Sequence, residues 1–156
     1  MKKIFIFLGL ISILFSVFAM ENISNGSGQL VTLGGKVLSY EELTASPKTI
    51  LFIWSTWCPS CRVTINDLAK KCATFKDVKI FYVDTGEKAS TLDNFLRRKD
   101  PGKCVKDNMV LDEEAVIANR FSVFAIPTFI FLRNGELVYR SHVIDDTLIK
   151  QVFDNR

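Results

Sequence analysis

The chain has 156 residues, with 20 lysines and arginines, 17 aspartates and glutamates, four cysteines and a single histidine. This length is enough for one compact domain that buries its own core without metal or disulfide cross-links. A net charge of +3 is too small for a nucleic-acid-binding protein, which needs its cations gathered on one face. The hydrophobic content of 48% excludes a largely disordered chain. The four cysteines fit a zinc site, a disulfide framework or a redox pair.

The first 19 residues have the pattern of an export signal. Lys2 and Lys3 precede an apolar run over residues 4–18, and the small residue Ala19 follows it. The run is shorter than the ~20 residues that a membrane-spanning helix prefers. We therefore predict a cleaved signal peptide over residues 1–19 rather than an uncleaved anchor. Either of the two would place the remaining chain outside the cytoplasm.

The rest of the chain divides into a leader and one domain. Residues 20–28 have the composition of a flexible leader, and residues 29–156 form the expected domain. Without the two signal lysines, 18 of the 20 cations remain against 17 anions. The exported domain is therefore nearly neutral.

The first half of the domain alternates strands and helices. Segments 30–33 and 36–38, joined by two glycines, predict a small hairpin. Ser39 and Glu42 have the spacing of a capping box for a short helix. The apolar run at 49–55 then predicts a strand whose two faces are both covered.

Two further pairs of elements follow. Their predicted ranges are a helix at 59–73, a buried strand at 78–83 and an amphipathic helix at 88–99. Strand, helix, strand and helix in this order require parallel pairing with right-handed crossovers. Residues 100–108 are predicted to form a polar loop.

The second half ends the sheet with a hairpin. After a short extended segment at 109–111, Asp112 is predicted to cap a helix that runs to about Phe121, with Glu113 and Glu114 near its positive end. Strands at 128–132 and 137–143 are joined across an Asn-Gly turn, and a helix at 145–153 closes the chain. The sequence therefore predicts an α/β fold with a central mixed sheet flanked by helices and an N-terminal hairpin extension.

The motif Trp57-Cys58-Pro59-Ser60-Cys61 lies where the first buried strand turns into a helix. A cysteine at a helix N-terminus has its thiolate stabilised by free backbone N–H groups and by the helix dipole, which makes it a nucleophile near neutral pH. Pro59 suits the first helical turn because no needed hydrogen bond is lost there. The spacing allows a disulfide, so we predict Cys58 as the attacking thiol and Cys61 as the resolving thiol.

This motif, together with Ala125-Ile126-Pro127-Thr128-Phe129 and the hairpin after it, resembles the thioredoxin-fold thiol–disulfide oxidoreductases over nearly the whole domain. The resemblance implies that the Ile126–Pro127 peptide bond is cis and lies beside the cysteine pair. A cis X-Pro bond at a strand end exposes a backbone edge that can pair with an extended peptide. The residues expected to contact substrate are Trp57, Pro59, Ser60, Ile126 and Pro127.

The segment 35–43 and the Trp-Cys-Pro-Ser-Cys-Arg motif resemble more specifically the extracytoplasmic TlpA/ResA type, which includes reductases of cytochrome c maturation. The resemblance implies a monomer that reduces disulfides in partner proteins and is re-reduced by a membrane electron donor. It implies neither a cofactor nor a metal, and no nucleic-acid partner.

The sequence departs from these relatives at their acid–base positions. Phe52 stands where thioredoxins have a buried aspartate, Ile80 aligns with the accompanying lysine, and Thr64 stands where ResA-type proteins often have a glutamate. Deprotonation of the resolving thiol then depends on water or on another carboxylate, for which Glu113 and Glu114 are the candidates.

Other functions remain open. A thiol oxidase is one alternative, because strong oxidants of this kind also have a proline between the two cysteines of the motif. Those enzymes carry a large helical insertion, however, and the 65 residues between Cys61 and Pro127 leave no room for it. A peroxiredoxin does not pair its nucleophile at this spacing. A copper carrier of thioredoxin fold would use His142 as a third ligand. A zinc site is disfavoured because Cys72 and Cys104 do not repeat the short spacing.

Cys72 has two interpretations. It continues the helical stripe of Cys61, Ile65 and Leu68, which would make it a buried and inert cysteine. The alternative is a disulfide with Cys104. Both helices that precede these cysteines run away from the active-site edge of the sheet, so the two cysteines are expected at the same far end of the domain. An even cysteine count in an oxidising compartment favours this structural disulfide.

Overall fold

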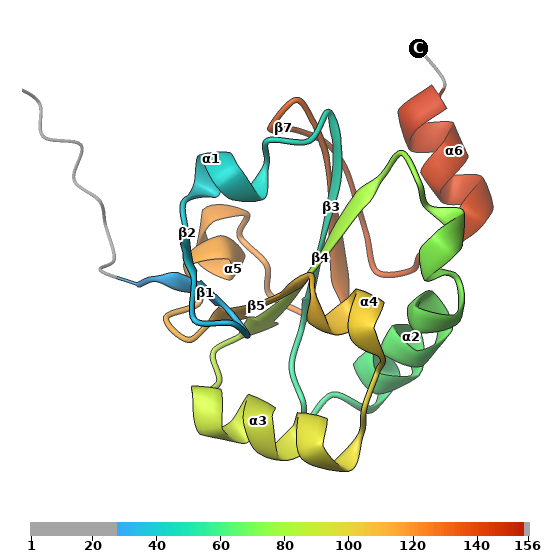
Figure 1. Cartoon of the computed structure of the whole chain (residues 1–156). Coiled ribbons are helices and arrows are strands. Elements are labelled where there is room, and N and C mark those ends of the chain that lie inside the picture. Colours follow the sequence, from blue (N-terminus) through green and yellow to red (C-terminus); the bar gives the residue numbers. More distant parts are fainter. Residues whose placement is uncertain (1–27, 155–156) are drawn as a thin grey trace, which may run out of the picture.

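The computed structural model describes residues 28–154, so the predicted signal peptide and residues 20–27 of the predicted leader lie outside it. A seven-stranded mixed sheet with the order β2-β1-β5-β4-β3-β6-β7 has helices on both faces (Figure 1). The predicted α/β architecture with its N-terminal hairpin is thereby confirmed. Between residues 28 and 154, no helix is long and apolar enough to cross a membrane.

Three parallel strands form the centre of the sheet. They are β3 (Lys48–Trp54), β4 (Lys79–Thr85) and β5 (Met109–Asp112), with β4 between the other two. Because they run in the same direction, their carboxyl ends meet at one edge of the sheet, where α/β proteins place their sites. β4 is longer than predicted, since it continues beyond Val83 through Asp84 to Thr85.

Antiparallel strands complete the sheet on both sides. β6 (Thr128–Arg133) pairs with β3, and β7 (Glu136–Ser141) pairs with β6 across the predicted Asn-Gly turn. On the other side, β1 (Leu30–Thr32) and β2 (Val37–Leu38) form the predicted hairpin, and β1 pairs with β5. The N-terminal hairpin therefore extends the central sheet.

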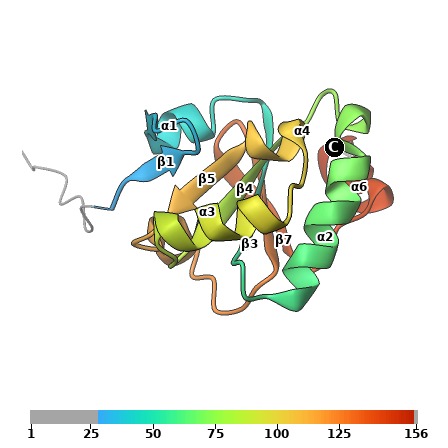
Figure 2. The same ribbon diagram turned by 60° about the horizontal axis from the view of Figure 1, so that its bottom comes forward.

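Within residues 28–154, four helices cover one face of the sheet, and Figure 2 shows α2 and α3 in front of the strands. The four are α2 (Pro59–Lys70), α3 (Ala89–Arg98), α4 (Lys103–Lys106) and α6 (Asp146–Asp154). Their inward side chains share one buried cluster with Phe52, Trp54 and both cysteines of the motif. α4 lies in the segment predicted as a loop; its one turn is anchored by the fully buried Val105.

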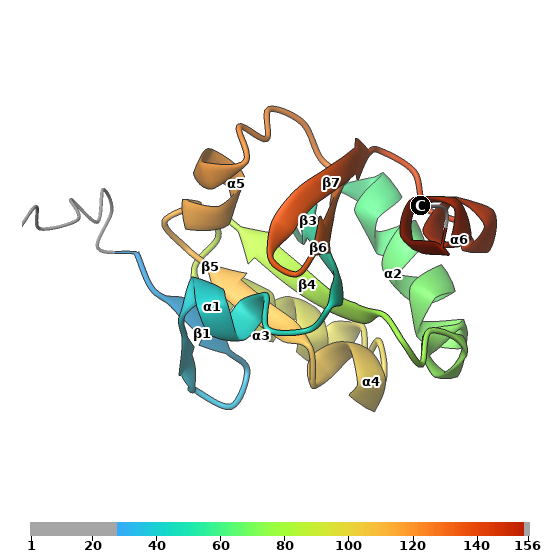
Figure 3. The same ribbon diagram turned by 90° about the horizontal axis from the view of Figure 1, so that it is seen from above.

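In the described part of the chain, two short helices cover the opposite face (Figure 3). α1 (Tyr40–Leu43) begins with the predicted capping box of Ser39 and Glu42. α5 (Val116–Arg120) begins later than predicted, because Ala115 with φ of 53° precedes it. Asp112 still caps this helix, since its carboxylate accepts the N–H groups of the first two residues, at 2.6 and 2.9 Å. The two glutamates at 113 and 114 therefore lie exposed in the turn, outside the helix.

Candidate active site

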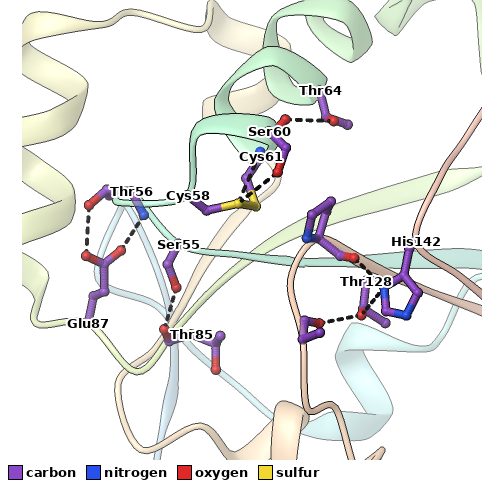
Figure 4. The surroundings of a disulfide bond; sticks show 12 residues. Ser55, Thr56, Cys58, Ser60, Cys61, Thr64, Thr85, Glu87, Thr128 and His142 are labelled. Atoms are coloured by element: carbon purple, nitrogen blue, oxygen red, sulfur yellow. Dashed lines mark hydrogen bonds between the residues drawn. A yellow bond between two sulfur atoms is a disulfide. The ribbon is translucent and has the colours of Figure 1, made fainter.

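The cysteine pair lies at the N-terminus of α2 (Figure 4). Cys58 is the N-cap residue and forms a disulfide with Cys61, with Cα atoms 5.3 Å apart. The Cys61 N–H donates to Cys58 Sγ at 3.2 Å, and the hydroxyl oxygen of Ser60 lies 3.4 Å from the same sulfur. The groups that face this sulfur in the disulfide are those that stabilise a thiolate after reduction.

The two cysteines differ in their surroundings. Cys61 is fully buried in the core, whereas Cys58 retains 3% exposure beside Trp57, which is 67% exposed. Pro59 and Ser60 are also exposed. A partner can therefore approach Cys58 from the side of Trp57, while Cys61 lies beneath it. This arrangement favours Cys58 as the attacking thiol.

The turn before the cysteine pair is fixed to the segment that follows β4. The N–H and hydroxyl groups of Thr56 both donate to the carboxylate of Glu87, and the Ser55 hydroxyl donates to the Thr85 carbonyl oxygen at 2.9 Å (Figure 4). The Cys58 N–H in turn donates to the Ser55 carbonyl oxygen at 3.1 Å. Glu87 was not among the residues predicted from the sequence, although its place after a parallel strand was a usable signal.

Pro127 lies at the same edge of the sheet as the cysteines. The Ile126–Pro127 peptide bond is cis, and Pro127 directly precedes β6, whose first residue pairs with Ile53 near the end of β3. Pro127 and Ser60 line one groove of about 440 Å³ that runs along α2. Two of the five predicted substrate residues thus meet in one groove, whereas Pro59 lines a separate hollow with Phe95 of α3.

His142 holds the segment that contains the cis bond. Its Nδ1 atom lies 2.8 Å from the Pro127 carbonyl oxygen and 3.2 Å from the Thr128 hydroxyl, which itself donates to the Ala125 carbonyl oxygen at 2.6 Å. Because a carbonyl oxygen only accepts, Nδ1 carries the proton in this arrangement. Among residues 28–154, no group of three histidine, cysteine or acidic side chains could hold a metal ion.

The expected acid–base positions are occupied by core residues. Phe52 stacks on Phe129 with ring centroids 4.6 Å apart, and its partner on β4 is Tyr82, while Ile80 pairs with Ile50. Burial raises the pKa of Tyr82 to about 12. The Thr64 hydroxyl donates to the Ser60 carbonyl oxygen and is not acidic.

The glutamates predicted as alternative acceptors lie elsewhere. Glu113 and Glu114 are exposed in the turn before α5, and α5 packs on the face opposite to α2. That candidate assignment is therefore wrong. A carboxyl group that is buried on the face of the cysteines comes instead from Asp84, which pairs with Trp54 across β3 and β4.

The other two cysteines form a second disulfide, with Cα atoms 6.4 Å apart. α2 ends at Lys70, and Cys72 begins a 3-10 turn (Cys72–Thr74), so it leaves the buried stripe of the helix and is half-buried. Cys104 lies exposed in α4. The bond therefore joins the end of α2 to α4, at the opposite end of α2 from Cys58.

Comparisons with known proteins agree with this fold. The model of the AhpC/TSA family matches residues 25–146. A Thioredoxin-like protein of Haemophilus influenzae is 31% identical over 111 residues, which make up 69% of this chain and 62% of that protein. The chain thus spans less than two thirds of the length of this relative.

Solved structures share the fold at lower identity. MTB DsbF gives a TM-score of 0.66 at 22% identity and covers 81% of this chain and 92% of its own. A secreted Mycobacterium tuberculosis disulfide oxidoreductase homologous to E. coli DsbE gives 0.62 at 21% identity, with 80% and 92% covered. The family match and the shared fold lead to one conclusion: the chain belongs to the AhpC/TSA family of thioredoxin-like proteins.

Proposed function

We propose that the protein is an extracytoplasmic thiol–disulfide oxidoreductase that reduces disulfides in partner proteins. The observation that carries this proposal is the position of Cys58 at the N-terminus of a twelve-residue helix, with its sulfur facing the Cys61 N–H. The groove lined by Ser60 and cis-Pro127 lies beside it. A reactive thiol, a resolving thiol and a place for a peptide are thus gathered at one edge of the sheet.

The reaction has two exchange steps. The Cys58 thiolate attacks one sulfur of a partner disulfide, which forms a mixed disulfide and releases the other partner sulfur as a thiolate that takes a proton. The Cys61 thiol then loses its proton to solvent, and its thiolate attacks the Cys58 sulfur and closes the internal disulfide. The second partner sulfur leaves as a thiolate and takes up a proton. Two electrons have then passed from the cysteine pair to the partner, which leaves as a dithiol.

Exposed apolar side chains surround the pair and support a contact with extended peptide. Trp57, Val63, Phe124 and Val143 are 67%, 62%, 95% and 69% exposed. Val63 and Val143 line the same groove as Ser60 and Pro127, and Phe124 lies two residues before Ile126. We infer that Trp57, Pro59, Ser60, Ile126 and Pro127 contact the substrate through apolar surface and backbone pairing.

The sequence supports action outside the cytoplasm. Residues 1–19 have the pattern of an export signal, and one structural neighbour is described as secreted. In an oxidising compartment a reductase needs a membrane electron donor that reopens its disulfide. We propose a monomer with disulfide-containing protein clients, for which the TlpA/ResA resemblance suggests apocytochromes c as one class.

Trapping a mixed disulfide tests the exchange chemistry. Cys61→Ser removes the resolving thiol, so client proteins should accumulate covalently on Cys58 and be released by dithiothreitol. The matched control, Cys58→Ser with Cys61 intact, should trap far less. Equal trapping by both variants, or none by either, would contradict the proposed roles.

A further inference from the structure

The carboxyl group of Asp84 is buried without a partner. The residue is 0% exposed, and neither of its oxygens has a hydrogen-bond partner among residues 28–154. In the same part of the chain, the Trp54 Nε1 and Thr85 Oγ1 atoms are also buried and unpaired. Burying such groups is unfavourable, so an acid kept in this position calls for a functional explanation.

Asp84 is connected to the cysteine pair through buried groups. Trp54 and Asp84 are direct neighbours across β3 and β4, and Trp54 belongs to the same buried cluster as Cys58 and Cys61. The backbone provides a second connection through Ser55, which joins the Cys58 N–H to the carbonyl oxygen of the residue after Asp84. Charges in such a water-poor setting act on one another strongly.

The titratable groups around Asp84 are acids. Glu87 lies on the segment after β4, Asp112 ends β5 on the other side of the sheet, and Tyr82 lies two residues earlier on β4. Burial comes first among the causes that raise the pKa of Asp84 to about 9. Glu87 comes next, by a side-chain interaction that favours the protonated acid and by its charge, and the Asp112 carboxylate is last.

Cations do not offset these acids. α3 turns Leu92 and Phe95 toward this core, whereas its charged residues are exposed. Those charged residues are Asp93, Arg97 and Arg98. No ion pair within the described part of the chain includes Asp84.

We propose that Asp84 is a buried acid whose protonation is coupled to the redox state of the Cys58–Cys61 pair. It is neutral when the disulfide is closed, and it holds its proton more tightly once Cys58 has become a thiolate. A neutral Asp84 does not repel the Cys58 thiolate, whereas an aspartate anion here would raise the free energy of forming that thiolate. This inference rests on the proposed function, because it assumes that Cys58 carries the thiolate.

The coupling has a defined proton balance. Reduction by a dithiol donor adds two electrons, leaves Cys58 as a thiolate and gives Cys61 one proton. Where the pH lies between the titration midpoints of Asp84 in the oxidised and reduced proteins, reduction also draws one proton from solvent to the Asp84 carboxylate. The equilibrium constant for reduction then falls by a further factor of ten per pH unit, equivalent to about 30 mV for two electrons.

Carbon-13 NMR of the aspartate carboxyl groups, against pH, tests this directly in the unaltered protein. The Asp84 midpoint should lie near pH 9 in the oxidised protein. In the reduced protein its proton should bind about tenfold more tightly. Asp112 is the internal control: it is equally buried, but its carboxylate binds α5 on the opposite face, so its midpoint should move much less than that of Asp84. An Asp84 midpoint that is identical in both redox states would overturn the inference.

Asp84→Asn provides the second arm, because it keeps the size of the side chain and removes its titration. The variant should lose the additional tenfold-per-pH-unit dependence and still exchange disulfides at neutral pH. An unchanged pH profile would contradict the coupling. If the wild-type protein and the variant both failed to exchange disulfides, the proposed function itself would be wrong. The NMR titration stands even if the variant does not fold.

Discussion

The Nδ1 atom of His142 lies 2.8 Å from the carbonyl oxygen of Pro127, which follows the cis peptide bond. The residue after β7 thereby holds the segment that we expect to receive the substrate backbone. Removing the donor with His142→Leu should free this segment. We expect kcat/KM for a partner disulfide to fall about fivefold, the effect of one lost hydrogen bond.

Conservative variants separate the two ring nitrogens of His142. Asparagine places its amide N–H near the position of Nδ1, so His142→Asn should stay within about twofold of wild type. Glutamine reaches the position of Nε2 instead, so His142→Gln should resemble His142→Leu. The reduction potential should be the same in all four proteins. A loss of kcat/KM in His142→Asn as large as in His142→Leu would argue against the role of Nδ1.

Trp57 should contribute to partner binding and not to folding, because it is 67% exposed. Trp57→Ala should lower kcat/KM for a protein substrate about tenfold, as expected for one aromatic anchor at an interface. The free energy of unfolding should change little. Leu33→Ala is the matched control, since Leu33 is also exposed, at 42%, but lies at the N-terminal hairpin. Equal losses in the two variants would show that general surface hydrophobicity, and not the rim of the site, is responsible.

The second disulfide should act on stability alone. Cys72 and Cys104 are separated by 32 residues, and closing such a loop stabilises a fold by roughly 3 to 4 kcal/mol through the unfolded state. The double variant Cys72→Ala/Cys104→Ala should lose about that much in urea unfolding, measured with the Cys58–Cys61 disulfide closed. Its exchange rate at moderate temperature should equal that of wild type. A changed reduction potential would show that the bond also affects the active site.

Asp84 should make stability depend on pH in a particular direction. The folded protein keeps this proton up to about pH 9, whereas an unfolded aspartate loses it near about pH 3.9. Between these values the folded state binds one proton more, so the free energy of unfolding falls as pH rises, by up to about 1.4 kcal/mol per pH unit. Asp84→Asn removes this contribution, and Asp112 contributes equally to both proteins.

Urea unfolding of the oxidised proteins at several pH values measures this effect. The variant should gain stability relative to wild type as the pH increases from about 5 to about 8. A difference that stayed constant with pH would mean that Asp84 is ionised in the folded protein.

Much of the fold could be predicted because its signals are local. The apolar run before Cys58, the helix after it and the Asn-Gly turn each carry their own pattern, and all three are present in the structure. α4 was missed because four residues show no periodicity. Its place in the fold depends on Val105, which is buried by distant parts of the chain.

The site was harder to predict than the cysteines themselves. Cys58, Cys61 and Pro127 stand in recognisable motifs, but Asp84 lies at the end of an apolar strand, and its burial depends on packing by β3 and α3. The contact between His142 and Pro127 depends on the register of β7 on β6, which a single sequence does not reveal. The sequence therefore did not predict these contacts between side chains on different strands.

The reduction potential of the Cys58–Cys61 pair is the measurement that tests the proposed reductase most directly. Equilibration of the purified protein with a dithiol buffer of known potential, with thiols counted by alkylation and mass spectrometry, gives this value separately from the second disulfide. We predict a potential near thioredoxin's, about −270 mV. A value near about −120 mV would contradict the account, because the pair would then oxidise its partners.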